Sequence, residues 1–292
     1  MAERNIRGKN KGVVWLQRCF YSLVALGVFS LVYVFQIEPM WFEVVPVSVT
    51  IPNLSPAFNG LKIVQISDIH ADTSMNQKKL TKIVELVTRQ QPDIIAMTGD
   101  FVTATPNTET VKLLENIFKQ FSPTEKTLAV LGNHDHWSNP DLIREILDRS
   151  NVIDISNFLY TIEREDARLA IAGVDDYWTN QSDLNSVLQQ LQPLDNVPAI
   201  LLAHEPDFAD ISAATHRFAL QISGHSHGGQ VKVPFRKPPV LPPYAQKYPV
   251  GRYQVEDLIQ YTNRGVGMVL PAVRLNCRPE ITVFTLNSQV KT

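Results

Sequence analysis

The stretch Leu61-Lys-Ile-Val-Gln-Ile-Ser-Asp-Ile-His70 decides the fold class of this chain. Its first six residues are typical of a buried β-strand, and two potential metal ligands, Asp68 and His70, follow the strand directly. The same arrangement returns downstream, where apolar runs end in Gly99-Asp100, Gly132-Asn133-His134-Asp135, His204 and Gly224-His225-Ser226-His227. Ligands that follow several strands predict one shared site at the carboxyl ends of the strands of an α/β sheet.

Strands and amphipathic helices alternate on both sides of these runs. Strands are expected at 61–66, 93–97, 127–131, 169–172, 199–203 and 218–222, and helices near 76–90, 108–121, 140–148 and 182–191. Alternation predicts parallel pairing early in the chain, while residues 254–286 are richer in strand than in helix. We therefore expect an α/β domain of two stacked mixed sheets flanked by helices.

The N-terminus predicts a membrane anchor. An uncharged apolar run from Cys19 to Ile37 follows five basic residues, and a bilayer-spanning helix needs roughly 17–25 residues. A cleaved signal peptide is the alternative, but its apolar core is shorter, roughly 7–15 residues, and needs a small-residue cleavage site. We expect a basic tail (1–18), a transmembrane helix (19–37), a connector with an edge strand at 43–51 (38–60), the α/β domain (61–286) and a short tail (287–292).

The basic flank predicts the topology of this single-pass anchor. Basic residues stay on the cytoplasmic side, so the N-terminus is expected in the cytoplasm and the domain on the opposite face, which is the periplasmic or outer face in a bacterial cell. The 292-residue chain has a net charge of −2, so a nucleic-acid partner is not expected. Cys19 lies inside the apolar run, so its two cysteines predict no disulfide framework. The oligomeric state is not indicated.

The spacing of the polar residues suggests how they would meet. On an extended strand residues i and i+2 face the same side, so Asp68 and His70 are expected to converge, and likewise His225 and His227. Asp100 stands alone after its strand, and its two carboxylate oxygens could bridge two cations, with Gly99 permitting a tight turn. The nitrogen and oxygen donors suit Mn, Fe, Zn or Co and argue against a cysteine-type zinc site.

These five runs, in this order, resemble the calcineurin-like metallophosphoesterases over roughly residues 45–286. Within that family, His204-Glu-Pro-Asp207, Gly228-Gly-Gln230 and Arg278-Pro-Glu280 resemble membrane-attached bacterial enzymes related to UDP-2,3-diacylglucosamine hydrolases. The resemblance implies a four-layer sandwich and two divalent cations, with Mn²⁺ as the first choice. It implies one metal on Asp68, His70 and His227, the other on Asn133, His204 and His225, and Asp100 as the bridge.

The resemblance also implies a reaction. A water activated between the two cations would hydrolyse a phosphodiester or pyrophosphate bond, with His134 as a catalytic non-ligand at the leaving oxygen. Asp135 would either orient His134 or cap a turn. An anchor beside the bilayer suggests a lipid-linked substrate such as UDP-2,3-diacylglucosamine, although nucleotide-activated lipids are made on the cytoplasmic side, against the expected topology. The alternative is a non-catalytic scaffold of the same fold that binds metal or phosphate.

Four further positions or segments have both a functional and a purely structural interpretation. Asn263 and Arg264 follow a strand and would contact the phosphate, or belong to a surface loop made flexible by glycine. His136 would contact the substrate or pack. Residues 175–178 would line the cleft or cap a loop. The proline-rich loop 233–252 is either a stiff surface loop or a flap facing substrate or membrane.

Overall fold

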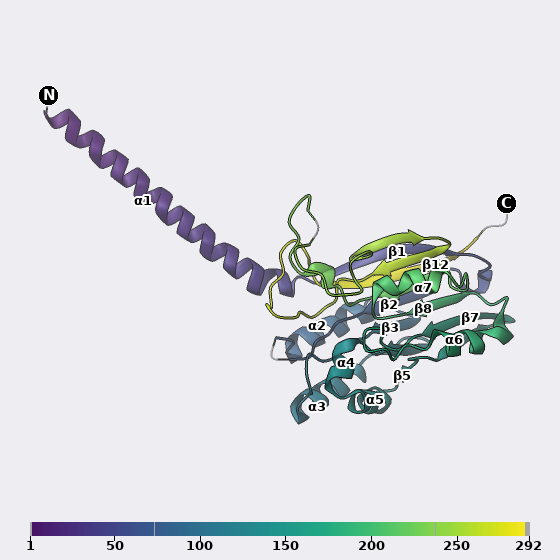
Figure 1. Cartoon of the computed structure of the whole chain (residues 1–292). Helices are drawn as coiled ribbons and strands as arrows, with labels where there is room; N and C mark the ends of the chain where they lie inside the picture. The colour runs from purple at the N-terminus through teal and green to yellow at the C-terminus, as the bar shows by residue number, and fades with distance from the viewer. Residues whose placement is uncertain (1, 73, 237, 290–292) are drawn as a thin grey trace.

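Within residues 2–72, 74–236 and 238–289, which the computed structural model describes, two six-stranded β-sheets stack face to face with helices on their outer faces (Figure 1). This confirms the expected fold class of two stacked mixed sheets flanked by helices. Met1, Lys237 and residues 290–292 lie outside the described residues, as do the side chains of 2–12, so parts of the expected basic tail and C-terminal tail are not described.

The first sheet carries the motif with which the sequence opens. Its strand order is β1-β12-β2-β3-β4-β5, and β12 is antiparallel to β2 while the other neighbours are parallel. β1 is an edge strand, as expected for residues 43–51. The strands are β1 (Glu43–Ile51), β2 (Lys62–Ile66), β3 (Ile94–Thr98), β4 (Lys126–Val130), β5 (Val152–Asp154) and β12 (Glu280–Ser288).

The second sheet has the order β10-β11-β9-β8-β7-β6. Its two ends are antiparallel pairs, β10 with β11 and β6 with β7, and its centre is parallel. The strands are β6 (Leu159–Arg164), β7 (Ala167–Gly173), β8 (Ala199–Leu202), β9 (Leu220–Ser223), β10 (Gly251–Val255) and β11 (Leu258–Thr262).

The core between the sheets follows from alternation along the strands. In β3, Ile94 and Ala96 face the second sheet, whereas Ile95 and Met97 face the outer helices. Because both faces are covered, the central strands are mostly apolar, as in β3 and β8, which is why they are visible as nearly continuous runs in the sequence. Phe284 of β12 and Tyr261 of β11 meet across this core with ring centroids 5.2 Å apart.

Helices α2, α3 and α5 pack their apolar sides on the first sheet, and α6 and α7 pack on the second. Asparagine or aspartate side chains cap four of the helix starts, as at Asn76 of α2, where Oδ1 accepts from Lys79 N. The helices of the domain are α2 (Gln77–Thr88), α3 (Thr108–Phe118), α4 (Asn133–Ser138), α5 (Pro140–Arg149), α6 (Leu184–Leu191) and α7 (Ala209–Ala213). The sequence did not predict α4, α7 and β5, which are short, or β6, which has six residues.

The long helix α1 (Ala2–Val32) leaves the domain as an isolated rod (Figure 1) and continues into the turns η1 (Tyr33–Ile37) and η2 (Glu38–Met40). Among the described residues, Val13–Met40 is the one helical segment long and apolar enough to cross a membrane. Its domain end is held firmly. Arg274 N donates to Val34 O at 3.0 Å, and Cys277 N donates to the buried Glu38 carboxylate at 2.6 Å.

The inter-sheet core makes a direct stability prediction. Phe284→Ala removes a fully buried ring and leaves a cavity, so it should lower the free energy of unfolding by about 3–5 kcal/mol. Thermal unfolding in detergent, followed by circular dichroism, should show a melting temperature lowered by several degrees. Phe158→Ala is the matched control, because that ring is 61% exposed and should change the melting temperature little. Equal shifts for the two variants would contradict this account of the core.

Candidate metal centre

The five polar runs all lie at the carboxyl ends of strands. Asp68 follows β2, Asp100 follows β3, and Asn133 begins α4 just after β4. His204 follows β8, and the His225 and His227 run follows β9, so both sheets contribute. Neighbouring parallel strands end at one edge of a sheet, and stacking the two sheets brings both edges together.

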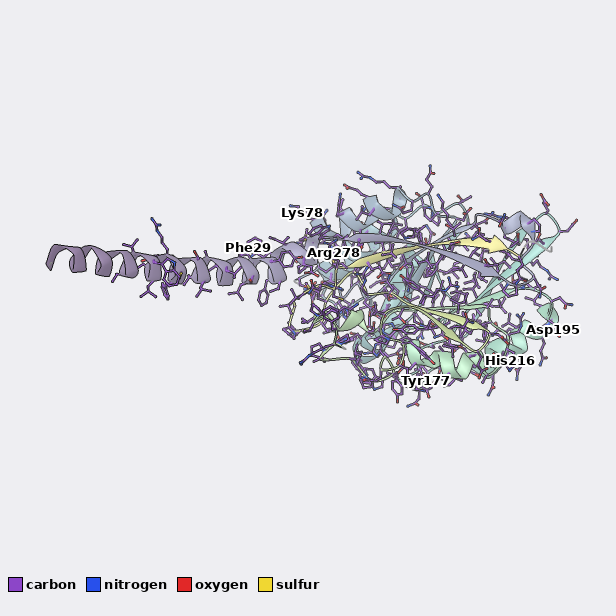
Figure 2. All side chains as sticks on the ribbon, turned by 90° about the horizontal axis from the view of Figure 1, so that it is seen from above. Phe29, Lys78, Tyr177, Asp195, His216 and Arg278 are labelled. Carbon is purple, nitrogen blue, oxygen red and sulfur yellow. The ribbon has the colours of Figure 1, made fainter. Side chains whose placement is uncertain are left out.

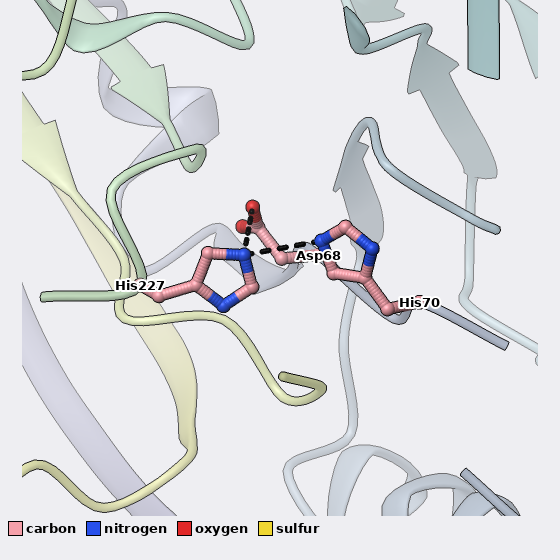
Figure 3. A group of neighbouring side chains, drawn as sticks. All are labelled: Asp68, His70 and His227. Atoms are coloured by element: carbon pink, nitrogen blue, oxygen red, sulfur yellow. Dashed lines mark hydrogen bonds and ion pairs between the residues drawn. The ribbon is translucent and has the colours of Figure 1, made fainter. Parts of the chain in front are cut away.

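Two groups of ligand-type side chains form at this edge. Asp68, His70 and His227 make one, shown in Figure 3, and Asp100, His204 and His225 make the other. Within each group the donor atoms lie within 4.8 Å of one another, and all six residues are buried. The imidazoles lie close together here: His70 Nε2 is 3.1 Å from His227 Nε2, and His225 Nδ1 is 3.1 Å from His204 Nε2.

The carboxylate of Asp100 stands between the two groups. Its Oδ2 is 3.4 Å from His70 Nε2 and 3.3 Å from His204 Nε2. Burial alone would raise the pKa of Asp100, but the combined attraction of His204, His70 and His134 holds that pKa well below its usual range. Likewise burial alone would lower the pKa of His204, and Asp100 raises it well above its usual value. The Asp100 carboxylate is therefore a negative charge that faces one histidine of each group.

Backbone carbonyls orient the histidines. His204 Nδ1–H donates to Thr98 O at 2.7 Å and His225 Nε2–H donates to Pro243 O at 2.9 Å, so the other ring nitrogen of each turns toward the centre. Burial lowers the pKa of His225 to about 3 and that of His70 to about 4. Neutral imidazole is the form that binds a metal.

One buried oxygen atom without a hydrogen-bond partner indicates that these residues fit a metal. Asn133 Oδ1 is buried and has no hydrogen-bond partner among the residues that the structure describes. An unsatisfied buried acceptor costs about 1–3 kcal/mol, so such an atom normally has a partner. A divalent cation beside Asp100 would supply one. The N and O donor set fits Mn, Fe, Zn or Co, and the choice of Mn²⁺ stays a prediction.

The expected route by which these residues meet is wrong. Asp68 and His70 are not extended: their φ angles are 53° and 46°, and those of His225 and His227 are 67° and 50°. The left-handed backbone breaks the i, i+2 rule of a strand. His225 and His227 consequently diverge, one into each group, instead of converging on one point.

Close approach of the loops explains two of the glycines. Gly99 has a φ of 83°, and a Cβ there would lie 2.6 Å from Gly132 N and 2.7 Å from His204 Nδ1. A Cβ on Gly224 would overlap Ser67 Oγ and Asp68 Oδ2. A methyl group at either position would push apart the loops that carry the ligands.

Asp135 caps a turn, which is the second of its two expected roles. Its carboxylate accepts from Asp100 N at 2.8 Å, from Phe101 N at 2.8 Å and from Gly132 N at 3.0 Å. It therefore joins the loop after β3 to the start of α4, which excludes its expected role of orienting His134 in this arrangement. Its position three residues after Gly132 is the spacing of a capping box, a signal that favours the turn-capping alternative.

His134 is oriented by Thr103 instead. His134 Nδ1–H donates to Thr103 O at 2.9 Å, while His134 N donates to Asp100 Oδ1 at 2.9 Å. A ring nitrogen of His134 lies within 4.8 Å of the donor atoms of His70 and Asp100. Thr103 belongs to the loop after β3, and nothing in the local sequence distinguishes it.

The structure does not bring the three expected substrate residues to the centre. Arg264 bonds Glu280 and, at 3.0 Å, Glu43, which pair side by side in β1 and β12, so the arginine neutralises two adjacent carboxylates. Asn263 is buried and donates to Thr282 Oγ1 at 2.7 Å. His136 Nε2 is 2.7 Å from Asp175 Oδ1. These contacts favour the packing interpretation of His136. They match neither interpretation of Asn263 and Arg264, because Asn263 is fully buried and Arg264 is held between two carboxylates and does not lie in a flexible surface loop.

A cavity of about 310 Å³ opens onto the centre, reaching Asp100, Asn133, His134, His225 and His227. Its walls are mostly apolar. Trp137 and Trp178, with ring centroids 4.8 Å apart, form one wall, and Val231, Val240, Leu270 and Val273 contribute to the other. Trp178 thus lines the cleft, as one interpretation of residues 175–178 expected, and the proline-rich loop supplies Pro239, Val240 and Pro242.

Comparison with known proteins decides the family. Residues 61–229 match the model of the calcineurin-like phosphoesterases. The chain belongs to this family. As a calcineurin-like phosphoesterase, it is a metal-dependent phosphoric ester hydrolase. It is 31% identical to the uncharacterized metallophosphoesterase YkuE of Bacillus subtilis over 88% of this chain and 89% of that protein.

Two further relatives extend the likeness. The phosphodiesterase YaeI of Escherichia coli is 28% identical over 87% of this phosphoesterase and 92% of its own length. A transmembrane protein with metallophosphoesterase domain from Danio rerio is 28% identical over 84% of this chain and 57% of its own. The finer likeness to UDP-2,3-diacylglucosamine hydrolases stays a prediction.

The orphaned oxygen of Asn133 makes a testable prediction. Asn133→Ala should reduce the amount of divalent metal bound per chain and weaken affinity for Mn²⁺ by about 10-fold or more, because it removes a buried oxygen donor. Elemental analysis after dialysis and calorimetric titration with Mn²⁺ would measure both. Asn116→Ala is the control, because Asn116 is exposed and lies in the outer helix α3. Unchanged metal content in a folded Asn133→Ala protein would contradict Asn133 as a ligand.

Proposed function

We propose that this chain is a membrane-anchored phosphoesterase that uses two divalent cations to hydrolyse a phosphodiester or pyrophosphate bond in a lipid-linked substrate. One observation carries the proposal: a mostly apolar cavity opens directly onto both groups of ligand-type side chains. A phosphate at the centre would leave an attached apolar substituent inside the cavity. UDP-2,3-diacylglucosamine remains one example of such a substrate.

We assign Asp68, His70 and His227 to one cation, Asn133, His204 and His225 to the other, and Asp100 to both. The grouping of the donor atoms, the position of Asp100 Oδ2 between His70 and His204, and the orphaned Asn133 Oδ1 support this assignment. When bound, a pair of cations neutralises phosphate charge and lowers the pKa of a water molecule toward 7 from about 15.7.

His134 supplies the proton that the leaving oxygen needs. It lines the cavity, its Nδ1–H is engaged by Thr103 O, and its backbone N–H is held by Asp100, so the ring cannot swing away. A proton held on the second ring nitrogen can then pass to the leaving oxygen or stabilise its charge. Trp137 stands beside the ring, with centroids 5.0 Å apart, and shields that side from water.

Two substitutions separate the metal role from the proton role. Asp100→Ala should abolish hydrolysis of bis-p-nitrophenyl phosphate and release metal. His134→Ala should lower kcat by about 10²–10⁴-fold and spare the metal content, since general-acid help is worth that much. His216→Ala is the control, because that side chain is 65% exposed and pairs only with Asp257.

Three results would count against these roles. Loss of metal in His134→Ala would make this residue a ligand. Full activity in the presence of a strong chelator would exclude a cation-dependent reaction. Absence of hydrolysis with Mn²⁺, Fe²⁺, Zn²⁺ or Co²⁺ would favour the scaffold alternative.

We also propose that the span within Val13–Met40 keeps the N-terminus in the cytoplasm and the domain on the opposite face. The basic residues before the span support this topology, and the division into tail, span, connector and domain rests on it. In intact cells or right-side-out vesicles, a C-terminal tag should be accessible to added protease, and an N-terminal tag should be protected. The reverse accessibility would place the domain in the cytoplasm, where nucleotide-activated lipids are made.

A further inference from the structure

We infer that the domain docks on an anionic bilayer surface through exposed apolar residues beside the exit of the membrane helix. We call these residues, Val233, Phe235, Val240 and Leu270, the apolar rim. The inference rests on the proposed membrane anchor and adds a second, separate contact with lipid. It makes the bilayer itself the partner of the cavity mouth.

The apolar rim is unusually exposed for large hydrophobic side chains. Phe235 is fully exposed, Leu270 is 87% exposed and Val240 is 74% exposed. Isolated exposed apolar residues are common, but a cluster on the mouth of one cavity marks an interaction surface. Val240 and Leu270 also line the cavity, so the rim is continuous with its apolar walls.

Hydrogen bonds hold the two loops that carry the apolar rim close to the point where the helix enters the domain. Arg274 N donates to Val34 O, which lies inside the candidate span, at 3.0 Å. Leu270 is only four residues from Arg274. In turn Lys232 N donates to Leu275 O at 2.8 Å, and Gln230 Nε2 donates to Val269 O at 3.0 Å. Both loops are therefore tied to the end of the span.

The figures show the same arrangement. In Figure 1 the loops before β10 and before β12 project at the end of the domain from which α1 leaves. In Figure 2 Lys78 and Arg278 lie near that junction, while Asp195 and His216 lie toward the opposite end. A bilayer that surrounds α1 would meet the first end and leave the second in water.

Charge at this end matches anionic lipid headgroups. Lys232, Arg236 and Lys78 are exposed, and Arg278 stacks on Trp41 with its guanidinium 3.5 Å from the ring centroid. Basic residues next to a membrane span are attracted to anionic lipid headgroups, and tryptophan favours the membrane interface. The apolar rim with basic residues around it complements an anionic lipid surface better than it complements a protein surface of mixed polarity.

The docking has a consequence for the substrate path. The cavity runs from Val240 and Leu270 at the rim to His225 and His227 at the centre. His225 itself is tied to the proline-rich loop through Pro243 O. With the rim in the headgroup layer, a lipid phosphate could reach the centre while its acyl chains stay in apolar surroundings.

Lipid quenching of site-specific probes tests the inference on the full-length chain. Single cysteines at Phe235, Leu270, Phe29 and Asp195 would carry an environment-sensitive fluorophore in a Cys19→Ser background, since Cys277 is buried. The labelled proteins would be placed in phosphatidylcholine–phosphatidylglycerol nanodiscs with and without spin-labelled lipid. We expect strong quenching at 235, 270 and 29, and none at 195.

The outcomes separate docking, anchoring and catalysis. Quenching at 29 with none at 235 and 270 would overturn docking and leave the anchor intact. No quenching at 29 would remove the anchor and the docking together. Probes at 235 and 270 shielded from aqueous iodide but not quenched by lipid would indicate a protein partner and overturn the inference. Quenching that persists after chelation, in a chain that hydrolyses no ester, would support docking while the proposed function fails.

Discussion

The arrangement of the strand ends in this structure depends on one buried carboxylate, that of Asp100. Burying a charge is costly unless opposite charge and hydrogen bonds compensate for it. Here the compensation comes from His204 and His70 on two sides of Oδ2 and from His134 N on Oδ1. Each of these groups must arrive from a different strand end, so the fold has to bring the edges of both sheets to one point.

The loops meet this requirement through conformations that ordinary strand geometry does not offer. Left-handed residues at Asp68, His70, Asp100, His225 and His227 turn the backbone sharply just after each strand. Asp135 then holds the loop after β3 against the start of α4 by accepting backbone N–H groups from both. The resulting centre faces the mostly apolar cavity, which suits a phosphate ester whose substituent is apolar.

Much of this could be predicted from the sequence, for physical reasons. The central strands are covered on both faces, so they appear as continuous apolar runs whose ends locate Asp68, Asp100, Asn133, His204 and His225. The local sequence did not predict the role of a residue whose contact partner is distant in the chain. Arg264 follows a strand and looks available for phosphate, but the pairing of β1 with β12 puts Glu43 beside Glu280 and engages it. His136 is similarly held by Asp175.

The sequence by itself determined the alternation of strands and helices, the order of the ligand runs, the family and the apolar N-terminal segment, because periodicity and residue chemistry are local properties. Only the tertiary structure decided how turns at single residues bring each histidine to its group, that Asp135 joins two loops, and that the rim and the end of the helix lie together. Those outcomes depend on stacking two sheets and on backbone turns at single residues, and no local pattern encodes contacts such as that between Arg274 and Val34, 240 positions apart in the chain.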